Sequence, residues 1–232
     1  MDSSMNFADL LYTASTWAIP VLFAVTLHEA SHGYAAWWLG DDTAYRQGRV
    51  TLNPLKHVDP FGTVLLPAML LVFRAPFLFG WAKPVPVAFG RLRKPRRDMV
   101  LVAAAGPGTN LVLAAISAGL FHALWMLPAG VDEWAAQVLY NSILLNLVLA
   151  VFNMLPLPPL DGGRVAVGLL PQALGRPLAR LEPYGMLILI GVIFILPLVG
   201  SRLGVRLDFF NTLVGTLVDR LMPLFTGMAG ID

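Results

Sequence analysis

Long apolar segments take up most of this 232-residue sequence, and they constrain its fold more than any other feature. A helix that crosses the hydrocarbon core of a bilayer needs about 20 predominantly apolar residues. Only 13% of the residues are charged, which is too few to cover a soluble domain of this size. The sequence therefore predicts an all-α polytopic membrane protein, a single domain over residues 1–232. About six transmembrane segments are expected, at residues 10–39, 61–79, 99–127, 134–155, 181–199 and 207–225.

Two of these six segments are irregular. The segment 61–79 is interrupted by prolines and is followed by GWAKPVPVAFG at 80–90, where prolines alternate. Proline is excluded from helix interiors and central strands, and non-helical backbone at membrane depth needs a covering of protein or a water-filled cavity. We therefore expect residues 75–90 to form a re-entrant or interfacial loop. Residues 45–52, with strand-like alternation around 49–52, and residues 83–89, where prolines suit an edge strand, are candidate β-like edges. Segment 207–225 contains Asp219 and Arg220, which leaves open whether it spans the membrane or lies in the interface.

Basic residues gather in the loops rather than along the whole chain. The densest run spans residues 91–97, and the loop after the first apolar segment is also basic, whereas the N-terminal residues carry only acids. In a soluble protein such a run would suggest nucleic acid, but beside apolar segments it is typical of a cytoplasmic loop. We therefore expect no nucleic-acid partner. The expected localisation is the bacterial inner or plasma membrane, with the N-terminus outside and the basic loops in the cytoplasm.

Three ionisable residues lie inside the first apolar segment, in the sequence His-Glu-Ala-Ser-His at 28–32. A charge at the centre of a membrane helix costs at least about 2.5–3.5 kcal/mol, so such residues usually have a function. His28 and His32 are four residues apart, share one helix face, and can bind the same metal ion. Glu29 points about 100° away from His28 on a helix with 3.6 residues per turn, where it can act as a general base toward water.

Two histidines leave a catalytic zinc site one ligand short, because such sites usually have three protein ligands. The chain has no cysteine, so the third ligand must be a nitrogen or oxygen atom. Asp161 closes the sequence PLPPLDGG just after the fourth apolar segment, and the predicted topology places it at the depth of His32. Gly162 and Gly163 would let the backbone turn sharply there. The sequence thus favours His28, His32 and Asp161 as the ligands of one zinc ion per chain.

Other residues are weaker candidates for a ligand. One histidine lies in a polar loop, where we expect it to be solvated, and another lies near the outer end of the third segment, where an interfacial position is expected. Two carboxylates are alternatives to Asp161, but neither lies in a proline- and glycine-rich sequence such as PLPPLDGG. These four residues are His57, His122, Glu182 and Asp219.

Three motifs together resemble the site-2 protease family of intramembrane zinc metalloproteases. They are HEASH at 28–32, AGPGTN at 105–110 and NMLPLPPLDGG at 153–163. TLNPLKHVDPFGT and GWAKPVPV are also similar to stretches of the compact bacterial members, and the resemblance covers about residues 20–190. It implies His28, His32 and Asp161 as zinc ligands and Glu29 as the catalytic base. Larger relatives carry a PDZ or CBS domain, for which this sequence has no room.

The resemblance also implies that two asparagines bind substrate. Asn153 is linked in the family to the substrate backbone or the oxyanion, and Asn110 closes a G-x-x-x-N motif whose role is less settled. Asn153 could equally cap backbone groups freed by the following prolines, and Gly106 and Gly108 could serve close helix packing.

The expected function is zinc-dependent hydrolysis of peptide bonds in transmembrane or membrane-proximal protein segments. The expected partners are a transmembrane protein substrate and the lipid bilayer, while the oligomeric state is open. A transporter would show polar residues along several spans and inverted repeats, and neither is present. A structural zinc scaffold would be expected to have four protein ligands rather than three.

Overall fold

The computed structural model describes residues 7–65, 69, 82–205 and 207–231, and within these ranges the regular structure is helical, without a β-strand. This confirms the all-α prediction. The main helices are α1 (Phe7–Trp38), α2 (Thr43–Arg46), α4 (Pro95–Leu120), α5 (Val131–Asn153), α6 (Asp161–Leu169), α7 (Gln172–Ala179), α8 (Gly185–Ile190), α9 (Leu196–Arg202) and α10 (Phe209–Ala229). Short 3-10 or π turns include η3 (Phe89–Arg91), η4 (Phe121–Met126) and η6 (Gly191–Ile195).

Four helical stretches are long and apolar enough to cross a membrane, at Phe7–Trp38, Pro95–Met126, Val131–Asn153 and Gln172–Arg202. They overlap four of the six predicted segments. Most of segment 61–79 lies outside the described residues. Segment 207–225 forms most of α10, which is not among the four and which carries Asp219 and Arg220. The prediction of six spans is therefore not confirmed.

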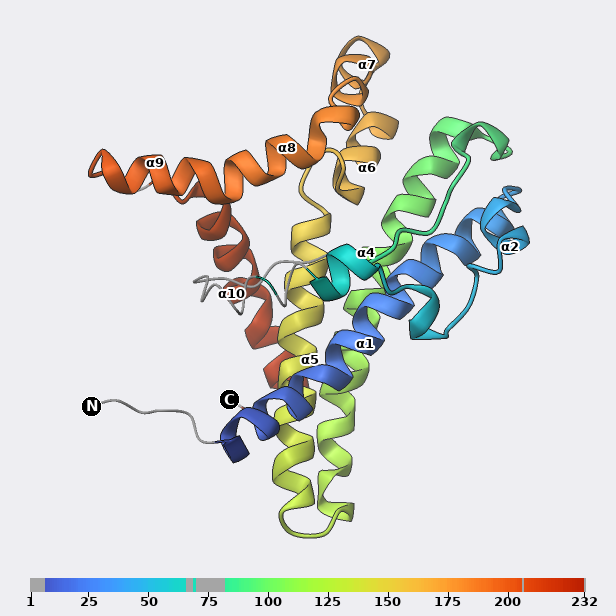
Figure 1. Ribbon diagram of the computed structural model, residues 1–232. Helices are drawn as coiled ribbons and strands as arrows, with labels where there is room; N and C mark the ends of the chain where they lie inside the picture. Colours follow the sequence, from blue (N-terminus) through green and yellow to red (C-terminus); the bar gives the residue numbers. More distant parts are fainter. Residues whose placement is uncertain (1–6, 66–68, 70–81, 206, 232) are drawn as a thin grey trace.

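The four longest helices form one packed bundle. Helices α4 and α5 make an antiparallel hairpin closed by η4, and α1 crosses both of them (Figure 1). Helix α10 packs along α5 and α4, while α8, η6 and α9 extend sideways from the bundle in this view. Small residues of α4 let the other helices approach closely. The buried contacts include Ala114 and Ala118 of α4, Ile143 and Leu147 of α5, and Val214 and Val218 of α10.

A proline inside α1 accounts for a polar link between α1 and α5. Pro20 has no N–H to donate to the carbonyl of Thr16, four residues earlier. The side-chain amide of Asn141, on α5, donates to this carbonyl at 3.3 Å, and both residues are buried. An unsatisfied carbonyl in apolar surroundings would cost several kcal/mol, so the pairing holds α1 against α5 at this height.

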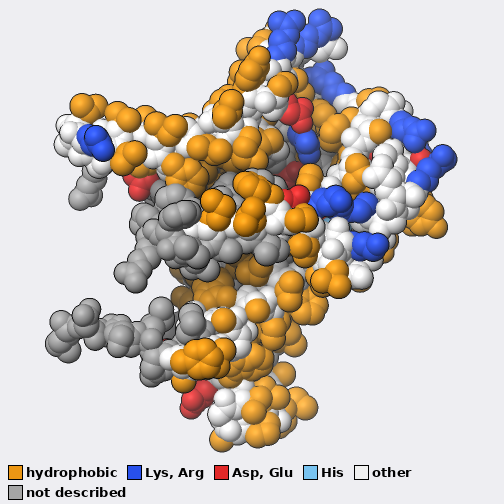
Figure 2. Space-filling view, viewed as in Figure 1, with side chains coloured by type: hydrophobic (Ala, Val, Ile, Leu, Met, Phe, Trp, Pro, Cys, Tyr) orange, Lys and Arg blue, Asp and Glu red, His pale blue; other side chains and the backbone are white. Residues whose placement is uncertain are grey.

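The two ends of the molecule differ in charge: one carries most of the basic residues, and the other carries none along the α4–α5 turn. No lysine or arginine occurs between residues 98 and 163, and the start of α5 carries Asp132 and Glu133. Figure 2 shows Lys and Arg gathered at the end that carries α2, α6 and α7, and mostly hydrophobic side chains over the body of the bundle. The turn between α4 and α5 lies at the opposite end (Figure 1).

The β-like edge predicted at 45–52 was wrong. These residues overlap the end of α2 and a turn in which Gly48 has φ 62°. The Asp41 carboxylate accepts the backbone N–H of Thr43 and its hydroxyl, and a left-handed glycine ends the helix. The alternation at 49–52 covers only four residues, which are too few to outweigh these local contacts.

Residues 82–88, which we call the strap, are non-helical and irregular, as predicted for part of segment 75–90. The strap pairs with side chains and loop backbone rather than with a strand among the described residues. Residues 75–81 lie outside the described part of the chain, and the re-entrant depth of the loop stays a prediction.

Candidate metal centre

Three side-chain atoms from two distant parts of the chain meet in one buried triangle. The Nε2 atoms of His28 and His32 are 3.1 Å apart, and Asp161 Oδ2 lies 3.2 Å and 3.3 Å from them. All three residues are less than 9% exposed. Ligand atoms about 2.0–2.1 Å from a tetrahedral zinc ion lie about 3.3–3.4 Å from one another. The triangle therefore has the dimensions of one face of a zinc coordination tetrahedron.

The hydrogen bonds of the two imidazoles leave their Nε2 atoms available as acceptors. His32 Nδ1 lies 2.7 Å from the carbonyl of Val102, which can only accept, so Nδ1 carries the proton. His28 Nδ1 lies 2.6 Å from Asn110 Oδ1. A neutral imidazole protonated at Nδ1 has its lone pair at Nε2. Two such lone pairs and a carboxylate oxygen can share this space only if a positive charge, a proton or a metal ion, lies among them.

The carboxylate of Asp161 also fits a metal ligand. Its Oδ2 is buried without a hydrogen-bond partner. Burial raises the pKa of a carboxyl group, but hydrogen bonds and positive charge from His28 and His32, when their Nε2 atoms carry protons, outweigh burial and hold the pKa of Asp161 well below its usual range. A buried carboxylate oxygen without another partner suits a metal ion held by the two imidazoles, which would take the place of those protons. His57, the next nearest histidine in sequence, belongs to no such group among the described residues.

Gly106 of α4 forms the wall against which the two histidines pack. A Cβ built on Gly106 would lie 2.6 Å from His28 Nε2 and would also overlap His32 Nε2. Real Cβ atoms do not approach other atoms so closely, so a side chain here would displace both rings. This resolves the role of Gly106 in favour of close packing, and what it packs against is the metal centre itself. Gly108 has open space at its Cβ position.

The two glycines after Asp161 serve a close approach rather than a turn. They lie in the first turn of α6, where a Cβ on Gly162 would overlap the Met154 carbonyl and one on Gly163 would lie 2.7 Å from the carbonyl carbon of Leu157. Neither glycine has a positive φ, so no special dihedral angle is used there, but the expectation that a Cβ would be in the way of the backbone is confirmed. Their lack of a side chain lets α6 begin directly against the 154–158 loop, which brings Asp161 to the histidines.

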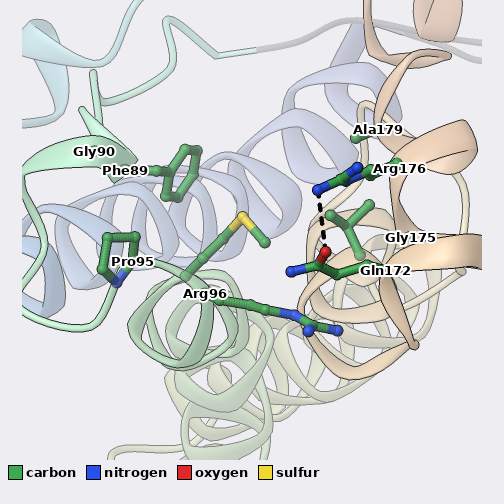
Figure 3. A pocket seen from close by; sticks show the side chains of 10 residues that line it. Phe89, Gly90, Pro95, Arg96, Gln172, Gly175, Arg176 and Ala179 are labelled. Carbon is green, nitrogen blue, oxygen red and sulfur yellow. Dashed lines mark hydrogen bonds between the residues drawn. The ribbon is translucent and has the colours of Figure 1, made fainter.

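Helix α6 is also held against α4 from its far end. Arg96 of α4 donates to the carbonyl oxygen of Gly168 at 3.0 Å and also to that of Leu170. Figure 3 shows this guanidinium reaching from α4 toward α6 and α7, beside a cavity of about 330 Å³. Cations stabilise the carbonyl end of a helix, so the contact fixes the position of α6 relative to α4.

Glu29 lies beside the triangle on α1 and contacts the strap. The backbone N–H of Val85 donates to Glu29 Oε2 at 2.8 Å. Val85 is buried and would touch a Cβ at Gly33, one turn further along α1. The strap therefore crosses α1 at Glu29, and its backbone directly contacts the carboxylate of that residue.

Two buried charged residues anchor the strap, and sequence reasoning did not single out either. Arg49, 7% exposed, donates to the carbonyl oxygens of Lys83 at 2.7 Å and Pro84 at 3.3 Å. Asp41, fully buried, accepts the N–H of Ala88 at 2.6 Å. Both follow the first apolar segment, where their burial depends on a segment more than 30 residues later. No local pattern in the sequence indicates such pairing.

The two asparagines assigned to substrate occupy different settings. Asn110 is fully buried, with its amide oxygen against His28. Asn153 is half-buried at the end of α5 and donates to the carbonyl of Leu149 at 3.0 Å, which is a backbone contact but not with a group freed by the following prolines. Contact of either residue with substrate stays a prediction.

The four weaker candidates lie outside the triangle. His57 is 2% exposed and its Nε2 bonds the Thr51 carbonyl, so the expectation of a solvated side chain was wrong. The cause is the strap, because Lys83 N–H donates to the His57 carbonyl and covers the loop. His122 bonds the Met228 carbonyl at the opposite end of the molecule. Glu182 pairs with Arg164, and Asp219 is exposed on α10.

Comparison with known proteins agrees with this geometry. A family model described as peptidase family M50 matches residues 129–198, which contain α5 and Asp161. YwhC of Bacillus subtilis, named as a candidate zinc metalloprotease, is 45% identical over 186 residues, which are 78% of this chain and 80% of that protein. The chain belongs to peptidase family M50. Membership of this family, the site-2 protease family, confirms the resemblance seen in the three motifs.

Two further M50 relatives are longer proteins. Rip2 of Mycolicibacterium smegmatis is 33% identical over 177 residues, and Rip2 of Mycobacterium tuberculosis is 31% identical over 176 residues. Each alignment covers 76% of this chain and 65% of the Rip2 protein. This M50 chain thus spans about two thirds of the length of the Rip2 proteins that it matches. Both are named as candidate zinc metalloproteases. No solved structure matches the chain significantly.

Proposed function

We propose that this chain is an intramembrane metalloprotease that binds one zinc ion and hydrolyses peptide bonds in transmembrane or membrane-proximal protein segments. The observation that carries the proposal is the triangle of His28 Nε2, His32 Nε2 and Asp161 Oδ2, with sides of 3.1–3.3 Å. Its three donors match the ligand set of a catalytic zinc site with one open position. Among the described residues no fourth protein ligand joins them, which favours catalysis over a structural site.

Each residue of the site has a role in this reaction. His28, His32 and Asp161 would hold the metal. When bound, zinc supplies Lewis acidity, which polarises the scissile carbonyl and lowers the pKa of water. Glu29 takes the proton of the attacking water and returns it to the leaving amine. The Val85 N–H holds one oxygen of this carboxylate, which restricts its rotation on the side of the strap.

A helical substrate must unwind before it can react, because a helix buries its carbonyl groups in its own hydrogen bonds. The strap is the proposed guide for the unwound segment. Pro84 and Pro86 hold it extended at low entropic cost, and they remove two N–H groups that would otherwise need partners. An extended substrate segment could align with the exposed edge of the strap and keep the extended conformation.

Localisation belongs to the same proposal. Asp161 begins α6, which lies at the end of the molecule that carries most of the basic residues (Figures 1 and 2), and basic loops face the cytoplasm. We therefore place the protein as a multi-pass protein of the bacterial inner membrane, with the site toward the cytoplasm. Its partners are a transmembrane substrate and the bilayer.

The test combines metal analysis with cleavage of a transmembrane model substrate. Wild-type protein should contain one zinc ion per chain, and His28→Ala, His32→Ala and Asp161→Ala should each lose most of it. Glu29→Gln should keep zinc and lose cleavage, because an amide has the shape of the carboxylate but cannot accept the proton. His122→Ala is the matched control and should change neither. Full zinc content in Asp161→Ala would refute the ligand assignment, and near wild-type cleavage by Glu29→Gln would refute the base.

A further inference from the structure

We infer that Asn110 and Asn146 are positioning residues of the metal centre, which hold His28 in the tautomer and orientation that point its Nε2 lone pair at the metal. This inference rests on the proposed function, because it concerns how the zinc ligand is held. The observation behind it is a buried chain of side-chain hydrogen bonds that runs from His28 on α1, through Asn110 on α4, to Asn146 on α5.

The polarity of this chain is set by the protein backbone. Asn146 Nδ2 donates at 2.9 Å to the main-chain carbonyl of Ser142, which can only accept. The other end of the Asn146 amide must therefore be its oxygen, and this oxygen accepts from Asn110 Nδ2 at 2.7 Å. Asn110 then presents its own oxygen to His28 Nδ1 at 2.6 Å. A second carbonyl, that of Ala24, accepts from Asn110 Nδ2 at 3.4 Å and favours the same orientation.

The consequence for His28 follows directly. Its Nδ1 faces an acceptor and must carry the proton, so its Nε2 is the free nitrogen. His32 obtains the same result from one backbone carbonyl, that of Val102. His28 Nδ1 has the side-chain oxygen of Asn110 as its acceptor in place of a backbone carbonyl. The two ligands are thus oriented by different means, one by the backbone and one by two amides.

Because Asn110 and Asn146 are buried, the orientation of both side-chain amides is fixed by their protein partners. Asn110 is 0% exposed and Asn146 is 1% exposed, so water cannot take the place of a missing partner. An unpaired polar group inside the protein costs about 1–3 kcal/mol, and reversing either amide would create at least one acceptor–acceptor contact. Asn146 lies in an apolar helix and belongs to none of the three sequence motifs. A polar residue in such a helix was the signal that could have drawn attention to it.

The experiment measures the zinc dissociation constant of the full chain in detergent, by competition with a zinc chelator. Asn110→Leu removes the acceptor of His28 and should weaken zinc binding by about 10- to 100-fold, as loss of a hydrogen bond to a metal-bound histidine typically does. Asn146→Leu leaves Asn110 with the weaker Ala24 contact and should weaken binding less. Asn110→Asp keeps an acceptor for His28 Nδ1 and should bind zinc within a few-fold of wild type.

The Asn110→Asp variant separates positioning from packing. It buries a charge and loses the hydrogen bond to Asn146, so a purely structural role predicts weaker zinc binding than in Asn110→Leu. A positioning role predicts the opposite order. If Asn110→Leu does not fold, Asn146→Leu and Asn110→Asp still decide between the two roles.

The matched control is Asn141→Leu. Asn141 is also a buried asparagine of α5, but its side-chain hydrogen bonds lead to the Thr16 carbonyl of α1 and to Gln137 rather than toward His28. It should lower thermal stability and leave the zinc dissociation constant unchanged. Equal zinc binding by wild type and Asn110→Leu overturns this inference. Absence of zinc binding in wild type would instead refute the proposed function.

Discussion

At the scale of single residues, the metal centre depends on the absence of a side chain at position 106. Helix α4 can touch His28 and His32 only because Gly106 offers no Cβ to them. Alanine is favoured over glycine inside a helix by about 0.5–1 kcal/mol, so helix propensity alone would favour replacement. The overlap of an alanine Cβ with the imidazoles of His28 and His32 opposes this replacement.

We predict that Gly106→Ala loses most of its bound zinc, because the added methyl group displaces the two imidazoles. Gly108→Ala lies two residues further along the same helix, has open space at its Cβ, and should keep full zinc content. Metal analysis of both purified variants checks the prediction. Full zinc content in Gly106→Ala would show that the histidines lie elsewhere.

At the scale of elements, the strap and α1 act on each other through backbone groups. Three of the four amide hydrogens in residues 83–88 have acceptors, at the His57 carbonyl, Glu29 and Asp41. Arg49 holds two carbonyl oxygens of the same segment. Because these contacts use backbone atoms, the position of the strap depends on its anchors more than on its own side chains.

We predict that Arg49→Met lowers cleavage by about 10-fold or more while zinc content stays normal, since a buried hydrogen bond to a charged group contributes about 1.5–3 kcal/mol. Hydrogen exchange of residues 83–88, followed by mass spectrometry, should become faster. Arg46→Met is the control, because Arg46 forms only a surface ion pair with Asp42. Unchanged exchange in Arg49→Met would mean that the strap is held without this anchor.

At the scale of the whole molecule, the distribution of charge predicts the orientation in the membrane. The turn between α4 and α5 is free of lysine and arginine, whereas α4 begins within the basic run 91–97. Positive loops remain in the cytoplasm, so the α4–α5 turn should face outward.

Cysteine labelling can test this orientation because the native chain has no cysteine. Ala129→Cys, in the α4–α5 turn, should react with a membrane-impermeant thiol reagent in intact cells. Leu174→Cys, exposed on α7, should react only after the cells are permeabilised. The reverse result would place the metal centre toward the outside and contradict the proposed localisation.

Several features of the protein could be predicted from its sequence. Composition and segment length indicated apolar membrane helices, because these depend on the solvent around each segment. The spacing of His28 and His32 placed both on one face, because a helix has a fixed rise and rotation per residue. Glycines beside a carboxylate in a proline-rich motif singled out Asp161, and family resemblance supported the set.

Other features were decided only by the tertiary structure. Asn110 and Asn146 hydrogen-bond to each other because α4 packs against α1 and α5 with these residues at the same level. The sequence of one helix does not specify that alignment. Arg49 and Asp41 are buried because a distant segment covers them, whereas alternation alone suggested a strand at 45–52. Local sequence sets the conformation and polarity of each segment. Which polar groups become partners depends on how segments far apart in the chain pack together, because each buried group must find its partner across a contact between elements.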